Sequence, residues 1–141
     1  MTTDYSTVTE LPGEDVTQEQ IERMARRYSW AGEYCCDKDV LEVACGAGQG
    51  LGYLELVAKS LKAGDITPSL VIRAQAHYGG RIRIEEMDAQ QLPFPDGSLD
   101  VVILFEAIYY LPLAEQFVSE CRRVLRRGGV RLARYRQQRS F

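Results

Sequence analysis

The sequence contains one histidine, four cysteines and no long apolar run, and each shortage excludes a class of protein. Cys35 and Cys36 are adjacent and no cysteine pair has the spacing of a zinc site, so we expect no metal. The longest apolar stretch, 99–111, includes two acids and is too short to span a bilayer. The N-terminal residues have no basic or apolar region typical of a secretory signal. We therefore expect a cytoplasmic protein that does not contact membranes.

The remaining pattern is that of a single α/β domain, because apolar strands alternate with amphipathic helices. Strands joined by helices form parallel βαβ units, which predicts a Rossmann-like, doubly wound parallel sheet. The predicted helices span residues 17–35, 49–61, 68–78 and 113–126. The predicted strands span 40–44, 62–66, 81–87 and 99–105, and a last strand begins at 130.

A glycine-rich loop follows the first predicted strand in "VLEVACGAGQG", residues 40–50. Gly46, Gly48 and Gly50 are spaced two apart, and such glycines let a backbone approach a ligand or simply make a tight turn. The dinucleotide-binding fingerprint does not fit, because Leu51 or Tyr53 stands where it requires glycine or alanine. The loop predicts a nucleotide-like ligand of another class.

Four segments, taken in order, resemble the class I S-adenosylmethionine-dependent methyltransferases. They are "VLEVACGAGQG", "GDIT", "MDAQQLPFPDGSLDVVILFEAIYYL" and "CRRVLRRGG", within residues 28–129. The sequence is especially similar to the small-molecule branch found in ubiquinone and menaquinone pathways, although Arg127 stands where proline is usual. The resemblance implies S-adenosylmethionine as cofactor and methyl transfer to a small-molecule acceptor by in-line displacement.

The resemblance also implies which residues contact the cofactor. Glu42, Ala44, Gly46 and Gly48 would line its methionine end, together with backbone at Phe105 and Glu106. Asp65 and Ile66 would hold the ribose and adenine, Asp88 and Ala89 the adenine amino group, and Tyr28 would cover the ligand. Tyr109 and Tyr110 are acceptor-side candidates. The lone histidine, His77, is expected to be structural, and no catalytic residue is assigned.

Each of these residues also has a purely structural explanation. Glu42 could cap the amides of its own loop, and Asp65 could form an Asx turn or cap the next helix. Asp88 could stabilise a turn. Tyr28 and the Tyr109–Tyr110 pair could be core side chains.

The resemblance ends after Gly129, where the composition also changes. All 20 acids lie at or before Glu120, whereas residues 122–141 contain eight arginines. We therefore divide the single domain 1–141 into a core, 17–129, and a basic divergent tail, 130–141. We favour a truncation or altered reading frame, which would lack the last helix and antiparallel hairpin, over a nucleic-acid-binding tail.

Such a truncation would leave a poorly covered sheet edge, and hence the possibility of a homodimer through that edge. The alternative to an active methyltransferase is a cofactor-binding but catalytically incompetent fragment, or an interaction module.

Overall fold

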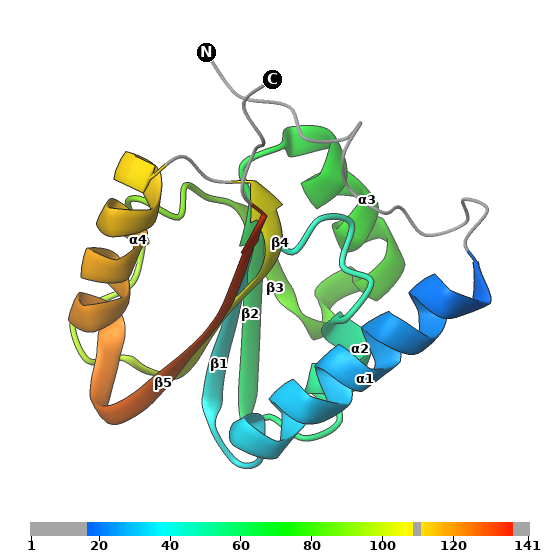
Figure 1. The fold of residues 1–141 in the computed structure, drawn as a ribbon, viewed down its shortest axis with the longest axis horizontal. Coiled ribbons are helices and arrows are strands. Elements are labelled where there is room, and N and C mark those ends of the chain that lie inside the picture. Colours follow the sequence, from blue (N-terminus) through cyan, green and yellow to red (C-terminus); the bar gives the residue numbers. More distant parts are fainter. Residues whose placement is uncertain (1–16, 109–110, 137–141) are drawn as a thin grey trace.

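The computed structural model describes residues 17–108 and 111–136, which form a five-stranded parallel sheet with helices on both faces (Figure 1). The strand order is β3-β2-β1-β4-β5, and every neighbouring pair is parallel. This arrangement confirms the predicted doubly wound α/β fold. The elements are α1 (Gln18–Cys35), β1 (Asp39–Val43), α2 (Leu51–Glu55), β2 (Ser60–Asp65), α3 (Pro68–Tyr78), the 3-10 turn η1 (Gly79–Arg81), β3 (Arg83–Glu86), β4 (Leu99–Ile108), α4 (Leu111–Val124) and β5 (Leu125–Arg136).

The central strands are apolar on both sides because α1, α2 and α3 cover one face of the sheet and α4 covers the other (Figure 1). Val40 of β1 and Ile103 of β4 pack in the same cluster as side chains of α1. Leu41 of β1 packs instead with Phe117 of α4. Because side chains alternate along a strand, Glu42 lies on the same face as Val40, beneath α1.

The start of α1 is fixed by a reciprocal capping box. The Gln20 amide donates to Thr17 Oγ1 at 3.1 Å, and the Thr17 amide donates to Gln20 Oε1 at 2.7 Å. The buried face of the helix carries Tyr28, Ala31 and Cys35. The cap thus sets the register that places Tyr28 against the sheet.

The predicted helix 49–61 was wrong, because α2 ends at Glu55. The chain turns back at Leu56, which is 86% exposed, and β2 then pairs with β1 from Ser60 opposite Asp39. Leu56 and Val57 completed an apolar helical pattern in the sequence, but they lie at the surface of the turn. The second strand accordingly begins two residues earlier than predicted.

Strand β5 runs across the predicted boundary between the core and the basic tail. Helix α4 ends at Val124, and β5 continues to Arg136, through residues that the sequence analysis separated as a basic tail. Val130 and Leu132 pair with Val101 and Ile103 of β4, and Leu132 is buried. Strand β5 is an edge of the described sheet, and a homodimer through this edge stays a prediction.

Two arginines of the arginine-rich segment 122–141 form ion pairs within the fold. Arg126 binds Asp39 and Asp100 at 2.9 and 3.0 Å near the beginnings of β1 and β4. Arg123 binds Glu120 and Asp96, and its guanidinium also donates to the carbonyls of Leu92 and Phe94 at 2.8 and 2.7 Å. The side chain of Arg123 therefore holds the loop between β3 and β4 against α4.

We expect Arg123→Ala to lower the free energy of unfolding by about 2 kcal/mol, because charge-assisted hydrogen bonds to carbonyl groups would be lost. Arg123→Lys should recover only part of the loss, since an ammonium cannot reproduce the forked geometry. Urea unfolding of both variants measures the effect. Arg122→Ala, an exposed change on the same helix, is the control and should shift the free energy by less than about 0.5 kcal/mol. Equal stabilities of the two alanine variants would contradict this role of Arg123.

The four cysteines are unpaired, and Cys35, Cys45 and Cys121 are buried. Burial raises the pKa of Cys35 to about 11 and that of Cys121 to about 12. These thiols therefore stay protonated and unreactive at neutral pH. Among the helices of the described residues, none is long and apolar enough to cross a bilayer.

Candidate functional site

The strand order places a topological switch point between β1 and β4. From β1 the chain proceeds outward to β2 and β3 on one side, and it returns to build β4 and β5 on the other. Ligands of open α/β sheets bind outside the carboxyl ends of the strands at such a point. The loop after β1, the end of β2 and Phe105 of β4 all lie at this edge.

The loop after β1 adopts a left-handed backbone at three of its positions. Gly46 and Gly48 have φ values of 62° and 86°, and Ala44 has a φ of 54°. A left-handed alanine is uncommon and strained, and such strain is concentrated at functional sites. The Tyr78 hydroxyl supports the loop, since it donates to the Gly48 carbonyl at 2.5 Å and accepts from the Gly52 amide at 3.1 Å.

Asp65, the last residue of β2, connects this loop to the beginning of α3. Its Oδ2 accepts from the Gly46 amide and its Oδ1 from the Thr67 amide, both at 2.9 Å. Burial raises the pKa of Asp65, and these amide hydrogen bonds oppose the rise. Asp65 therefore forms the Asx turn before α3 that the sequence analysis gave as its structural explanation. The Thr67 side chain and the Ile66 amide also hydrogen-bond to this carboxylate, so groups of the protein itself already use its four or so acceptor positions.

Glu42 of β1 is buried, with 2% of its surface exposed. Its Oε1 accepts a hydrogen bond from the Tyr28 hydroxyl, whereas Oε2 is buried and accepts none within the described residues. Burial raises the pKa of Glu42 to about 8, although the Tyr28 hydrogen bond and the Arg27 charge oppose the rise. The sequence analysis allowed Glu42 to cap the amides of its own loop. Among the described residues, the carboxylate instead accepts its hydrogen bond from Tyr28.

Tyr28 of α1 covers Glu42 from the side opposite the sheet. Its ring is stacked on Tyr53 at a centroid distance of 6.0 Å and meets Phe105 edge-on at 5.5 Å. A Cβ atom on Gly50 would lie only 1.8 Å from the Tyr28 ring. The third glycine of the loop thus makes room for the tyrosine. The sequence analysis noted Gly50 without assigning it this packing role.

The remaining predicted residues are distributed along the same edge. Ile66 follows Asp65 and is partly exposed, and Asp88 follows β3, the strand next to β2. The Asp88 carboxylate accepts from the Gln90 amide at 2.8 Å, which is turn chemistry, and Ala89 is buried in the core. Glu106 belongs to β4, whereas Tyr109 and Tyr110 lie outside the described residues.

These residues fit a cationic, nucleoside-like ligand. A buried carboxylate with an oxygen that lacks a hydrogen bond in the described chain is favourable for an ammonium or sulfonium group. The left-handed glycines bring backbone close to the same place, and carboxylates follow β2 and β3. Sheet order, glycine loop and acids together are those of a class I methyltransferase fold.

Comparison with known proteins agrees with this class. A family model described as a methyltransferase domain matches residues 41–133, and the chain belongs to this family. A probable S-adenosylmethionine-dependent methyltransferase of Mycolicibacterium smegmatis is 41% identical over 103 residues, which cover 73% of this chain and 40% of that protein. A probable phthiotriol/phenolphthiotriol dimycocerosates methyltransferase of Mycobacterium ulcerans is 41% identical over 95 residues, 65% of this chain and 37% of that protein.

The crystal structure of the PH0226 protein of Pyrococcus horikoshii superimposes with a TM-score of 0.80 at 25% identity, covering 93% of this chain and 65% of that one. The Mycolicibacterium smegmatis relative is named as dependent on S-adenosylmethionine, which is the cofactor that the resemblance implied. The chain spans about two fifths of the length of the curated relatives it matches. The ubiquinone-pathway branch stays a prediction.

Proposed function

We propose that this chain binds S-adenosylmethionine at the carboxyl ends of β1 and β2, and that it provides the cofactor site of a methyltransferase acting on a small molecule. The observation that carries the proposal is the buried Glu42, whose Oε2 accepts no hydrogen bond within the described residues. The bound cofactor supplies a methyl group activated by attachment to a sulfonium.

The residues of this chain would bind and orient that group. Glu42 and the loop at Gly46 and Gly48 would hold the methionine end, and a ligand ammonium would favour the ionised form of Glu42. Asp65 and Ile66 would hold the ribose and the adenine. Asp88 and Ala89 would then face the adenine amino group. These assignments are supported by the position of all seven residues at or just after the carboxyl end of a strand.

Methyl transfer by in-line displacement depends mainly on positioning and on exclusion of water. Tyr28 already covers Glu42, and its ring packs edge-on against Phe105. The Mycobacterium ulcerans relative is named for phthiotriol/phenolphthiotriol dimycocerosates, which supports a small-molecule acceptor for this chain. Tyr109 and Tyr110 stay acceptor-side predictions.

The test is calorimetric titration of S-adenosylhomocysteine, the stable product form of the cofactor, into the protein and its Asp65→Asn variant. We expect at least tenfold weaker binding in the variant, because one carboxylate oxygen becomes an amide donor that faces backbone N–H groups. Asp37→Asn is the control, since Asp37 is an exposed aspartate before β1, at the opposite end of the strands.

Thermal unfolding of the same samples shows whether Asp65→Asn has damaged the fold. A folded Asp65→Asn variant with unchanged affinity would leave Asp65 with only its Asx-turn role. Absence of binding by the folded parent protein would overturn the proposed function itself.

A further inference from the structure

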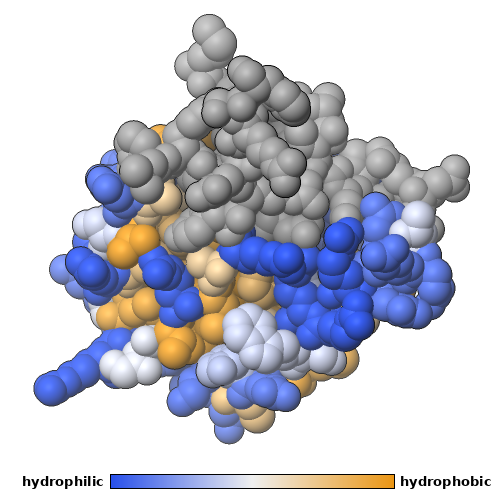
Figure 2. All heavy atoms as spheres, in the orientation of Figure 1, coloured by the Kyte–Doolittle hydropathy of each residue, from blue (hydrophilic) through white to orange (hydrophobic). Residues whose placement is uncertain are grey.

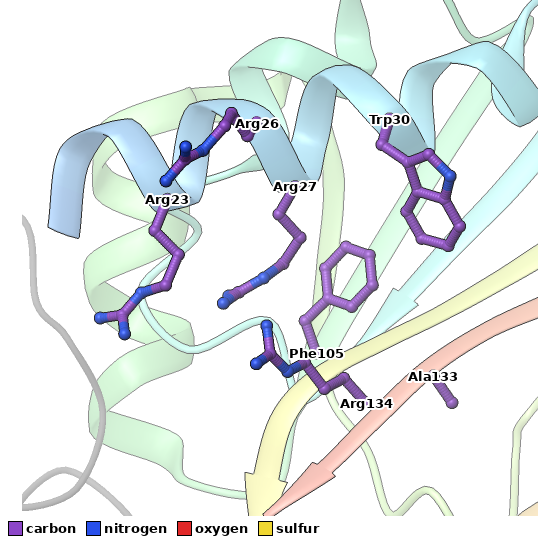
Figure 3. Close-up of a pocket in the computed structure, with 7 residues that line it drawn as sticks. All are labelled: Arg23, Arg26, Arg27, Trp30, Phe105, Ala133 and Arg134. Atoms are coloured by element: carbon purple, nitrogen blue, oxygen red, sulfur yellow. The ribbon is translucent and has the colours of Figure 1, made fainter. Parts of the chain in front are cut away.

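A cavity of about 430 Å³ opens between α1 and the carboxyl ends of β4 and β5 (Figure 3). Seven residues line it, namely Arg23, Arg26, Arg27, Trp30, Phe105, Ala133 and Arg134. The first four come from successive turns of α1, and the other three come from the two strands. The cavity is therefore created by the tertiary packing of α1 against the sheet.

Among the residues that the structure describes, the lining includes four guanidinium groups and no carboxylate. In Figure 3 the side chains of Arg27 and Arg134 extend toward the same part of the cavity, to one side of the Phe105 ring. Within the part of the chain that the structure describes, neither Arg26 nor Arg134 forms an ion pair. Like charges gathered in one cavity favour an anion, and guanidinium groups match carboxylate and phosphate oxygens in geometry.

The floor of the cavity is apolar. Trp30 is 46% exposed, and the Phe105 ring lies 5.6 Å from the Arg27 guanidinium carbon. Figure 2 shows hydrophilic surface bordering directly on hydrophobic surface on the face that carries β5. A small inorganic anion would leave this aromatic surface in water, whereas a ligand with an acidic head and an apolar chain would use both parts of the lining.

The cavity is also adjacent to the proposed cofactor site. Phe105 lines the cavity and contacts the Tyr28 ring at 5.5 Å, and the Tyr28 hydroxyl donates to Glu42. One aromatic layer therefore separates the arginines from the carboxylate assigned to the methionine end of the cofactor. A molecule lying in the cavity would have its apolar part beside that layer.

We propose that this cavity binds the methyl acceptor, and that the acceptor is an amphipathic acid. Its carboxylate or phosphate lies among the arginines, and its apolar chain, which carries the nucleophilic atom that accepts the methyl group, lies on Trp30 and Phe105. That the bound molecule is the methyl acceptor rests on the proposed function. The binding of an amphipathic anion, however, can be measured without the cofactor.

Trp30 provides the readout because it is the single tryptophan of the chain and lines the cavity. Decanoate, decyl phosphate and decanol, each below its aggregation concentration, are titrated into the protein while tryptophan fluorescence is recorded. We expect saturable changes with one or both anions and at least tenfold weaker binding of decanol. Preference between the anions identifies the head group as carboxylate or phosphate.

The double variant Arg26→Gln/Arg134→Gln should bind the anions at least tenfold more weakly and decanol as before, since both side chains are exposed and the apolar floor is unchanged. Arg73→Gln, an exposed change on α3, is the control and should match the parent protein. Circular dichroism of each variant verifies the fold. Added salt should weaken binding of the anions more than binding of decanol.

Decanol binding as tight as decanoate binding would overturn the proposal, and so would unchanged anion affinity in the double variant. A double variant with unchanged anion affinity but lower thermal stability would show that the arginines serve the fold. Titration of S-adenosylhomocysteine into the same samples separates the two hypotheses. Absence of cofactor binding by the parent protein rejects the proposed function, whereas absence of discrimination between the anions and decanol by the parent protein rejects the acceptor class.

Discussion

The free energy of unfolding should fall by on the order of 4 kcal/mol as the pH rises from about 4.5 to about 8, because Glu42 is buried. Its pKa is raised from 4.5 to about 8 by burial in the folded protein. Between these values the folded state holds a proton on Glu42 that the unfolded state has lost. The stability is therefore complete below the unfolded pKa and is lost as the pH approaches the folded pKa.

Other titratable groups change how steeply the free energy of unfolding falls between the unfolded and folded pKa values of Glu42, but they do not reverse the direction. The pKa of Asp65 is also raised by burial, which adds loss of stability in the same direction. The pKa values of Asp39, Asp100 and Glu120 are lowered by hydrogen bonds and ion pairs. Their contribution is lost only as the pH falls through the acidic range, below the Glu42 window.

Urea unfolding at a series of pH values measures the slope, and Glu42→Gln is the matched variant because it keeps the size of the side chain without its charge. We expect the variant to lose most of the pH dependence and to be more stable than the parent at pH 8. Tyr28→Phe removes a hydrogen bond that lowers the pKa of Glu42, so it should move the loss of stability to higher pH. Parallel pH profiles for the parent and Glu42→Gln would show that Glu42 titrates normally.

The fold could be predicted from the sequence because its strongest signals are local. Strand β4 is a continuous apolar run, α1 begins with a capping box, and α3 has proline in its first turn. The helix predicted over 49–61 failed because Leu56 and Val57 are apolar but exposed, so the pattern suggested burial that the turn does not provide. A last strand was predicted from 130, although the charge of residues 130–136 led the sequence analysis to assign them to a basic tail. The inward positions of this strand are Val130 and Leu132.

The candidate site was predicted in part, for a related reason. Residues that directly follow a strand, such as Asp65 and the glycines, are placed at one edge by topology alone. The contact between Tyr28 and Glu42, the support of the loop by Tyr78, and the arginine cavity join segments that are distant in the chain. Such contacts depend on how α1 and α3 lie on the sheet, and a single sequence contains no signal for that.

Alanine substitution at two glycines of the same loop and helix should have opposite effects on stability. Gly50→Ala should lower the free energy of unfolding by about 3 kcal/mol, because its Cβ would lie 1.8 Å from the Tyr28 ring, and overpacking of this kind displaces a core side chain. Gly52→Ala should raise it by about 0.5–1 kcal/mol, because Gly52 lies within α2 and alanine is the better helix former.

The difference between the two variants isolates the packing of Tyr28. At Gly52 an added Cβ meets only the Tyr78 hydroxyl, at 3.7 Å, which is ordinary contact. Urea unfolding of both variants gives the free energies, and near-ultraviolet circular dichroism detects displacement of the aromatic cluster in Gly50→Ala. A displaced Tyr28 would also leave Glu42 without its described hydrogen-bond donor, so the pKa of Glu42 should rise further in this variant. Equal and small effects of both substitutions would mean that Tyr28 does not pack over Gly50 in solution, and would remove the aromatic cover from the candidate cofactor site.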